Sequence, residues 1–272
     1  MRDQSKITSL ARNLTEWADR PANQRFLQDE QEAVLQAAAG GQQTPQVPVA
    51  AWMLGTWHLG RGFCRVLRGD VRGFDEARTG QALRRCSLLL RYRNRSFDRR
   101  RATGLSFSLP QAGLTVLLGL ALEDPNAEPL FEVVRTLPDR AFKDKDQLPL
   151  FARDLLTLRA GKRSSHSAQL GQYQDVLLQW TGDERVLALR LATVLDLHLQ
   201  EVTGKGGTFE DPPSRLYPLE AIAVLKVRQW LELPAPRVEH ALMFTNLVTM
   251  KPTGPWPSNQ TVTRLERLLA QR

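Results

Sequence analysis

Thirteen arginines lie between positions 61 and 101 of this 272-residue chain, in a window with four acidic residues and no lysine. The whole chain carries a net charge of +8, so its basic character belongs largely to this one stretch. Guanidinium groups bind carboxylates and phosphates through paired hydrogen bonds. The window therefore predicts one of three roles: a surface for an acidic protein, a surface for nucleic acid, or internal salt bridges beside a solvated face.

Four of these arginines recur at helical spacing. Arg61, Arg65, Arg68 and Arg72 are separated by four, three and four residues, which places them on one face of a helix. We expect that helix over 49–67, a turn at Gly69 and Asp70, and a returning helix over 75–92. The four arginines are predicted to contact a partner.

A second candidate surface is the loop that runs from Phe209 to Arg215. Phe209 stands beside Glu210 and Asp211, and two prolines stiffen the segment before Arg215. An exposed aromatic side chain flanked by acids on a rigid loop is a suitable docking element. We therefore predict partner contacts for these four residues, the alternative being an ordinary solvated loop.

Patterns typical of catalysis or metal binding are missing from the sequence. The four histidines lack metal-ligand spacing, and the glycines near Lys205 follow a predicted helix and lack the Ser or Thr of a phosphate-binding loop. We predict no enzymatic activity and no catalytic, cofactor-binding or metal-binding residues. Cys64 and Cys86 lie in apolar stretches and are expected to be buried thiols.

Helical periodicity dominates the elements that must position these residues, and alternating strand patterns are nearly absent. We predict an all-α fold of about eleven helices in antiparallel hairpins, forming an irregular, repeat-like array or bundle. The expected helices of the C-terminal part include 183–202, 238–250 and 260–271. The expected domain is 1–272, with a possible subdivision into 1–103 and 104–272.

The chain gives no sign of a membrane span or a signal peptide. Its longest apolar region, Leu114 to Leu122, is about half the length that a membrane helix needs. The first residues lead into a polar helix without the apolar core of a signal peptide. We expect a cytoplasmic protein without a membrane partner.

Two segments resemble the immunity protein 49 family of bacterial toxin–immunity systems. In the C-terminal third, a loop over 211–216 precedes the segment Tyr217-Pro218-Leu219-Glu220-Ala221-Ile222-Ala223-Val224-Leu225, followed by Arg228-Gln229-Trp230-Leu231. Upstream, Leu67-Arg68-Gly69-Asp70 and the alanine-containing helix after it are similar to that family's early hairpin. The resemblance extends over about two thirds of the chain in architecture.

The resemblance implies an antitoxin that binds a cognate toxin, such as a type VI secretion effector, and occludes or distorts its active site. Such families contribute no catalytic residues. Inhibitors of nuclease toxins often present an acidic surface, whereas this chain is basic. We therefore expect docking through either the acidic loop at Glu210 and Asp211 or the arginine face. The alternative is a nucleic-acid-binding or regulatory protein that uses the Arg61–Arg101 hairpin.

Overall fold

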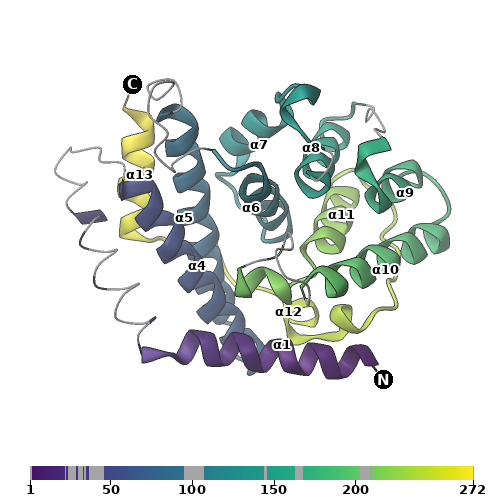
Figure 1. The fold of residues 1–272 in the computed structure, drawn as a ribbon, viewed down its shortest axis with the longest axis horizontal. Helices are drawn as coiled ribbons and strands as arrows, with labels where there is room; N and C mark the ends of the chain where they lie inside the picture. Colours follow the sequence, from purple (N-terminus) through teal and green to yellow (C-terminus); the bar gives the residue numbers. More distant parts are fainter. Residues whose placement is uncertain are drawn as a thin grey trace. The chain divides into compact units, whose positions relative to one another are not determined.

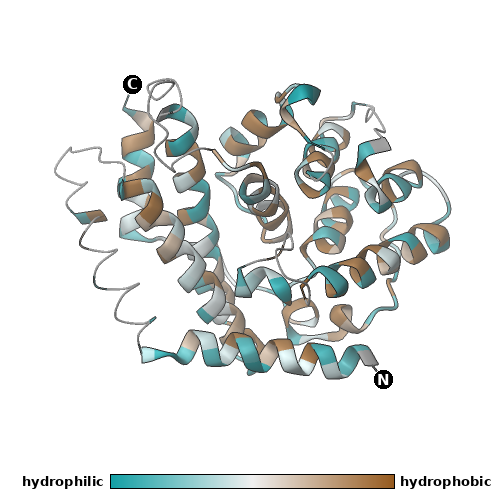
Figure 2. Cartoon of the chain, viewed as in Figure 1, coloured by the Kyte–Doolittle hydropathy of each residue, from teal (hydrophilic) through white to brown (hydrophobic). Residues whose placement is uncertain are grey.

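The computed structural model describes residues 2–21, 23, 29, 33, 35–36, 46–94, 107–143, 146–162, 168–202, 209 and 211–271. Over these residues it contains eleven α-helices, several short 3-10 turns and no strand, so the all-α prediction is confirmed. In Figure 2 the helices carry brown and teal residues in alternation, as expected for helices that each bury one face. No described helix holds an 18-residue window apolar enough to cross a bilayer.

The chain divides into two compact units, each built from segments that are distant in sequence. Unit 1 comprises Met1–Leu10, Leu109–Glu123 and Phe131–Thr249, and unit 2 comprises Ala11–Ser108, Asp124–Leu130 and Met250–Arg272. The helices are α1 (Arg2–Asp19), α4 (Gln46–Leu67), α5 (Gly73–Asn94), α6 (Leu109–Ala121), α7 (Glu128–Arg135), α8 (Gln147–Arg159), α9 (Gln172–Leu178), α10 (Glu184–Glu201), α11 (Leu219–Trp230), α12 (Asn246–Thr249) and α13 (Gln260–Ala270).

In unit 1, α6 packs against α8 and α11, and α10 packs against α9 and α11 (Figure 1). Ten consecutive residues of α6, from Ala112 to Ala121, are buried, which explains why this helix is apolar on every side. Asp183 caps α10 by accepting a hydrogen bond from the backbone N–H of Arg185 at 2.7 Å.

One helix predicted in unit 1 does not form. The segment 238–250 was expected to be a single helix, but it contains a 3-10 turn at Ala241–Phe244 and the four-residue α12. Thr245 between them has the extended angles φ −75° and ψ 157°, which a helix cannot accommodate.

Unit 2 is organised around the antiparallel hairpin of α4 and α5, with α13 packed against α5 (Figure 1). The predicted hairpin and its turn are thus confirmed. Its core joins Leu54 and Trp57 of α4, Leu83 and Cys86 of α5, and Leu265 of α13. Both cysteines are free and buried, as expected.

Glycines allow the two helices of the hairpin to approach at backbone distance. A Cβ on Gly62 would lie 2.5 Å from the backbone nitrogen of Ala77 and 2.5 Å from the carbonyl oxygen of Gly73. A Cβ on Gly80 would lie 2.5 Å from the backbone nitrogen of Leu59. Backbone atoms cannot move aside like the end of a side chain, so these positions require glycine.

Gly62→Ala is therefore expected to lower the free energy of unfolding by about 3 kcal/mol, the upper range for overpacking, although alanine favours a helix. Gly69→Ala is the matched control, because Gly69 has φ +89° and no atom within 4 Å of the added methyl. Its cost is limited to the left-handed backbone, about 1 kcal/mol. Urea denaturation followed by circular dichroism measures both values, and equal costs would contradict this account of the packing.

Candidate functional site: an arginine pocket on the hairpin

The predicted arginine face lies at the C-terminal end of α4 in unit 2. Arg61, Arg65 and Arg68 line one pocket, which confirms that their spacing brings them together. Arg72 lies in the link between α4 and α5, where its backbone N–H donates to Asp70 Oδ1 at 3.1 Å, and it is not among the described lining residues. The side chain of Arg72 is 78% exposed, so it is accessible but separate from the pocket.

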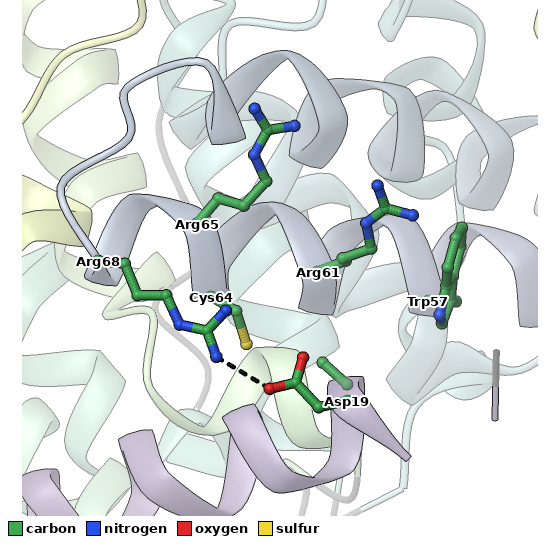
Figure 3. Close-up of a pocket in the computed structure, with 7 residues that line it drawn as sticks. Asp19, Trp57, Arg61, Cys64, Arg65 and Arg68 are labelled. Atoms are coloured by element: carbon green, nitrogen blue, oxygen red, sulfur yellow. Dashed lines mark hydrogen bonds and ion pairs between the residues drawn. The ribbon is translucent and has the colours of Figure 1, made fainter. Parts of the chain in front are cut away.

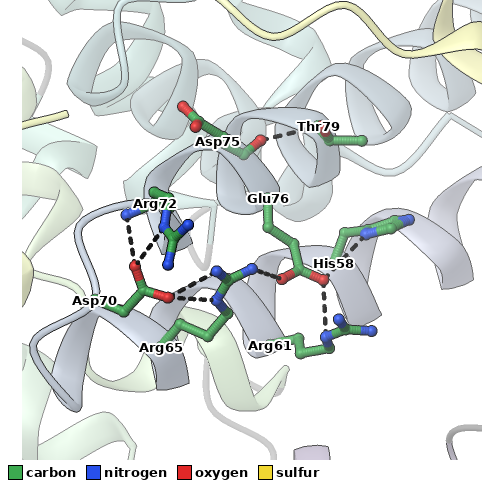
Figure 4. A network of polar contacts seen from close by, with 8 residues as sticks. All are labelled: His58, Arg61, Arg65, Asp70, Arg72, Asp75, Glu76 and Thr79. Atoms are coloured by element: carbon green, nitrogen blue, oxygen red, sulfur yellow. Dashed lines mark hydrogen bonds and ion pairs between the residues drawn. The ribbon is translucent and has the colours of Figure 1, made fainter. Parts of the chain in front are cut away.

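Carboxylates from the link and from α5 hold these guanidinium groups in place (Figure 4). Arg65 donates from Nε and Nη2 to Asp70 Oδ2 at 3.0 and 2.7 Å. Glu76 lies 3.0 Å from Arg61 Nε, 3.4 Å from Arg65 Nη1 and 3.5 Å from His58 Nδ1. Multiple contacts to one guanidinium restrict its rotamers more than a single ion pair does.

The same contacts set the protonation of both acids. Burial raises the pKa of Glu76, but His58, Arg61 and Arg65 lower it by more, so the net pKa lies below the ordinary value. The hydrogen bonds from Arg65 hold the pKa of Asp70 below its usual range. Both acids are therefore charged at neutral pH, and the network is an ionic one.

The pocket has a volume of about 200 Å³ and lies between α4 and the end of α1 (Figure 3). Its remaining described lining residues are Ala18, Asp19, Trp57 and Cys64. Arg68 Nη2 donates to Asp19 Oδ2 at 2.9 Å, and the Arg61 guanidinium lies 4.8 Å from the Trp57 ring centroid. Sequence reasoning missed Asp19, because it belongs to another helix. It also missed Trp57, which lies four residues before Arg61 on α4 and could have been found from the same helical spacing.

Four other arginines of the predicted basic surface are internal. Arg78, Arg84, Arg85 and Arg91 of α5 are all buried. Arg85 donates to Asp124 at 2.9 Å and to Glu266 at 2.7 Å, so it joins α5 to α13 inside unit 2. The arginines at 95–101 lie outside the described residues. The basic window is therefore partly structural.

The second predicted surface, the loop at 209–215, is not arranged as expected. The prediction that Phe209 is exposed is wrong: its side chain is only 2% exposed and its ring lies 4.0 Å from that of His198. Burial of a large aromatic ring stabilises the fold more than exposure on a loop would. Arg215 donates from Nε to the carbonyl of Phe209 at 3.1 Å, and Asp211 accepts from the hydroxyl of Ser214 at 2.9 Å. Glu210 lies outside the described residues.

His198 of α10 contacts this loop at the Arg215 carbonyl and at the Phe209 ring. His198 Nδ1 lies 3.1 Å from both carboxylate oxygens of Glu220, and Nε2 lies 3.1 Å from the carbonyl oxygen of Arg215. A carboxylate and a carbonyl oxygen accept hydrogen bonds, so this arrangement favours the ring with a proton on both nitrogens. Both side chains are 0% exposed, and Tyr173 approaches Glu220 at 3.5 Å. Sequence spacing gave no signal for this pair, which lies 22 residues apart.

This buried pair predicts a pH-dependent stability. Burial lowers the pKa of His198, but the Glu220 carboxylate and the Arg215 carbonyl raise it by more, and the net pKa is raised. The stabilisation is therefore complete below the unfolded pKa of about 6.5 and is lost as pH rises through the folded value. As pH rises from 6, the free energy of unfolding of the wild type should fall relative to that of the uncharged His198→Gln/Glu220→Gln variant, because deprotonation leaves the Glu220 carboxylate without its charged partner. His198→Ala should cost about 3 kcal/mol at pH 6, because it leaves a buried carboxylate unpaired. Parallel pH profiles for the wild type and the double variant would refute the ion pair.

Comparison with known proteins adds no relative: the chain matches no family model, no curated protein and no solved structure.

Proposed function

We propose that this protein binds a cognate bacterial toxin in the cytoplasm and neutralises it by stoichiometric complex formation. The resemblance to the immunity protein 49 family implies this activity, and the arginine pocket offers a surface for it. The observation that carries the proposal is three partly exposed guanidinium groups around one pocket, each fixed by a carboxylate. Arginine fixed before binding loses little side-chain entropy in a complex and is enriched at protein interfaces.

The position of the pocket also suits a protein partner. It lies on a hairpin whose helices meet at backbone distance, so the surface is rigid. The Trp57 ring beneath Arg61 adds an aromatic wall to the charged rim. Arginine is among the residue types most often responsible for binding energy at interfaces, and the buried Trp57 ring supports Arg61 from below. In this proposal the arginine face, and not the loop at Phe209, contacts an acidic face of the toxin.

The alternative, a nucleic-acid-binding protein, has weaker support. Phosphate binding depends on net positive charge along a surface. Here Arg61, Arg65 and Arg68 are each paired with an acid, and four more arginines of the window are buried. These pairs reduce the field that a polyanion would experience. A salt-dependent gel shift of DNA or RNA at physiological ionic strength, abolished by charge reversal at Arg65 and Arg68, would favour this alternative over ours.

The proposal is tested by co-expression with the product of the adjacent gene. We expect growth to be rescued and the two proteins to co-elute as one complex on gel filtration. Arg68→Glu should weaken the complex by about 2 kcal/mol, because it turns an attractive contact into a repulsive one. Arg185→Glu is the matched control, since Arg185 is exposed at the start of α10 in unit 1. Toxicity without rescue, together with separate elution, would refute the proposal.

A further inference from the structure

The polar wall of the arginine pocket consists mainly of hydrogen-bond donors. Arg61, Arg65 and Arg68 can only donate, and the indole of Trp57 can only donate. Burial raises the pKa of the Cys64 thiol, so this group also keeps its proton at neutral pH. Asp19 is the single acceptor side chain among the described lining residues. Such a wall is complementary to a negatively charged oxygen ligand.

The indole N–H of Trp57 is a buried donor in the side chain that lines this wall. Trp57 is 1% exposed, and its Nε1 has no hydrogen-bond partner among the residues that the structure describes. A buried donor without an acceptor costs about 1–3 kcal/mol, so natural proteins rarely leave one unpaired. In Figure 3 the nitrogen lies on the edge of the ring that faces the end of α1. The nitrogen itself is covered in the free protein, so it reports on a ligand through the ring that lines the pocket.

Asp19 itself indicates which anion the pocket takes. The three lining arginines contact three carboxylates, Asp19, Asp70 and Glu76, and Arg72 also contacts Asp70, so the described network carries no excess of negative charge. Among the described residues, Asp70 and Glu76 are fixed by several contacts each, whereas Asp19 makes one ion pair, with Arg68, and both side chains of that pair are more than half exposed. Figure 3 shows the Asp19 carboxylate directed into the pocket toward Arg68. A carboxylate of a partner can therefore take the position of Asp19 on Arg68, with the same charge and the same contact.

We propose that this pocket binds one Asp or Glu side chain of a protein partner, and that Asp19 takes the place of that carboxylate in the free protein. The inference deepens the proposed function and rests on it for the identity of the partner. A volume of about 200 Å³ accommodates a carboxylate with its methylene stem, and Ala18 and the Trp57 ring supply apolar contacts for the stem. Asp19 thereby sets the affinity, because the partner's acid must displace it from Arg68.

The test is a titration of the isotope-labelled full chain with N-acetylglutamate amide, followed by the indole N–H resonances. The Trp57 resonance is assigned by its loss in Trp57→Phe, or from triple-resonance spectra if that variant does not fold. We expect a saturable shift of this resonance, and no shift with the neutral N-acetylglutamine amide. Asp19→Asn should bind the probe several-fold more tightly, because the competing carboxylate is removed. Arg68→Gln should bind it about tenfold more weakly, as expected for loss of a charge-assisted hydrogen bond.

Arg185→Gln is the matched control, because it removes the same charge from an exposed position at the start of α10 in unit 1. Its affinity for the probe should equal that of the wild type. The proposal is overturned by no shift in either the wild type or Asp19→Asn, by equal shifts with the neutral amide, or by tighter binding of inorganic phosphate. The probe contains no toxin, so this result and growth rescue can fail independently.

Discussion

The contact on which the site depends is the backbone-to-backbone approach of α4 and α5. Gly62 and Gly80 sit where any side chain would collide with the facing helix, so the two helices have one distance and one register. That register places Glu76, in the first turn of α5, within 3.5 Å of both Arg61 and Arg65 of α4. If the two helices lay further apart, Glu76 would not reach these guanidinium groups, and the arginine side chains would adopt many rotamers in water. The glycines therefore determine the electrostatics of the pocket, although they do not line it.

The same hairpin also contains buried arginines, whose ion pairs join α5 to other segments of unit 2. Arg85 is buried between Asp124 and Glu266, and a buried ion pair stabilises a fold only when its geometry compensates the loss of hydration. Replacing either acid would leave a buried charge, which makes this arrangement specific even where its net stabilisation is small. Arg85 is buried and Arg68 is exposed, yet both count equally as arginines of the same basic sequence window. The charge of a sequence window therefore does not measure the charge of a surface.

Local sequence patterns predicted more of the fold than of the candidate site. Periodicity and punctuation predicted α4, α5, α10 and α13 to within a few residues, because amphipathic spacing and helix ends are encoded locally. The segment 238–250 was predicted wrongly, since extended angles at Thr245 interrupt an apparently helical pattern. The arginine spacing predicted that Arg61, Arg65 and Arg68 meet. Their partner Asp19 lies 49 residues from Arg68, and no local pattern encodes that contact. Phe209 was misplaced for the same reason, because the histidine that receives it belongs to another helix.

The pairing of every pocket arginine with an acid bears on the kind of partner this surface selects. Unpaired arginines attract any polyanion over roughly a Debye length, about 8 Å at physiological salt. Paired arginines exert little field at that range and act mainly at hydrogen-bond distance. Binding then replaces one carboxylate by another, so the affinity for a partner depends more on the geometry of the contact than on net charge. Under the proposed function, such a site discriminates against nucleic acid, whose phosphates offer charge but no methylene stem to fill the space beside Trp57. It favours an acidic side chain presented at one position on a folded protein.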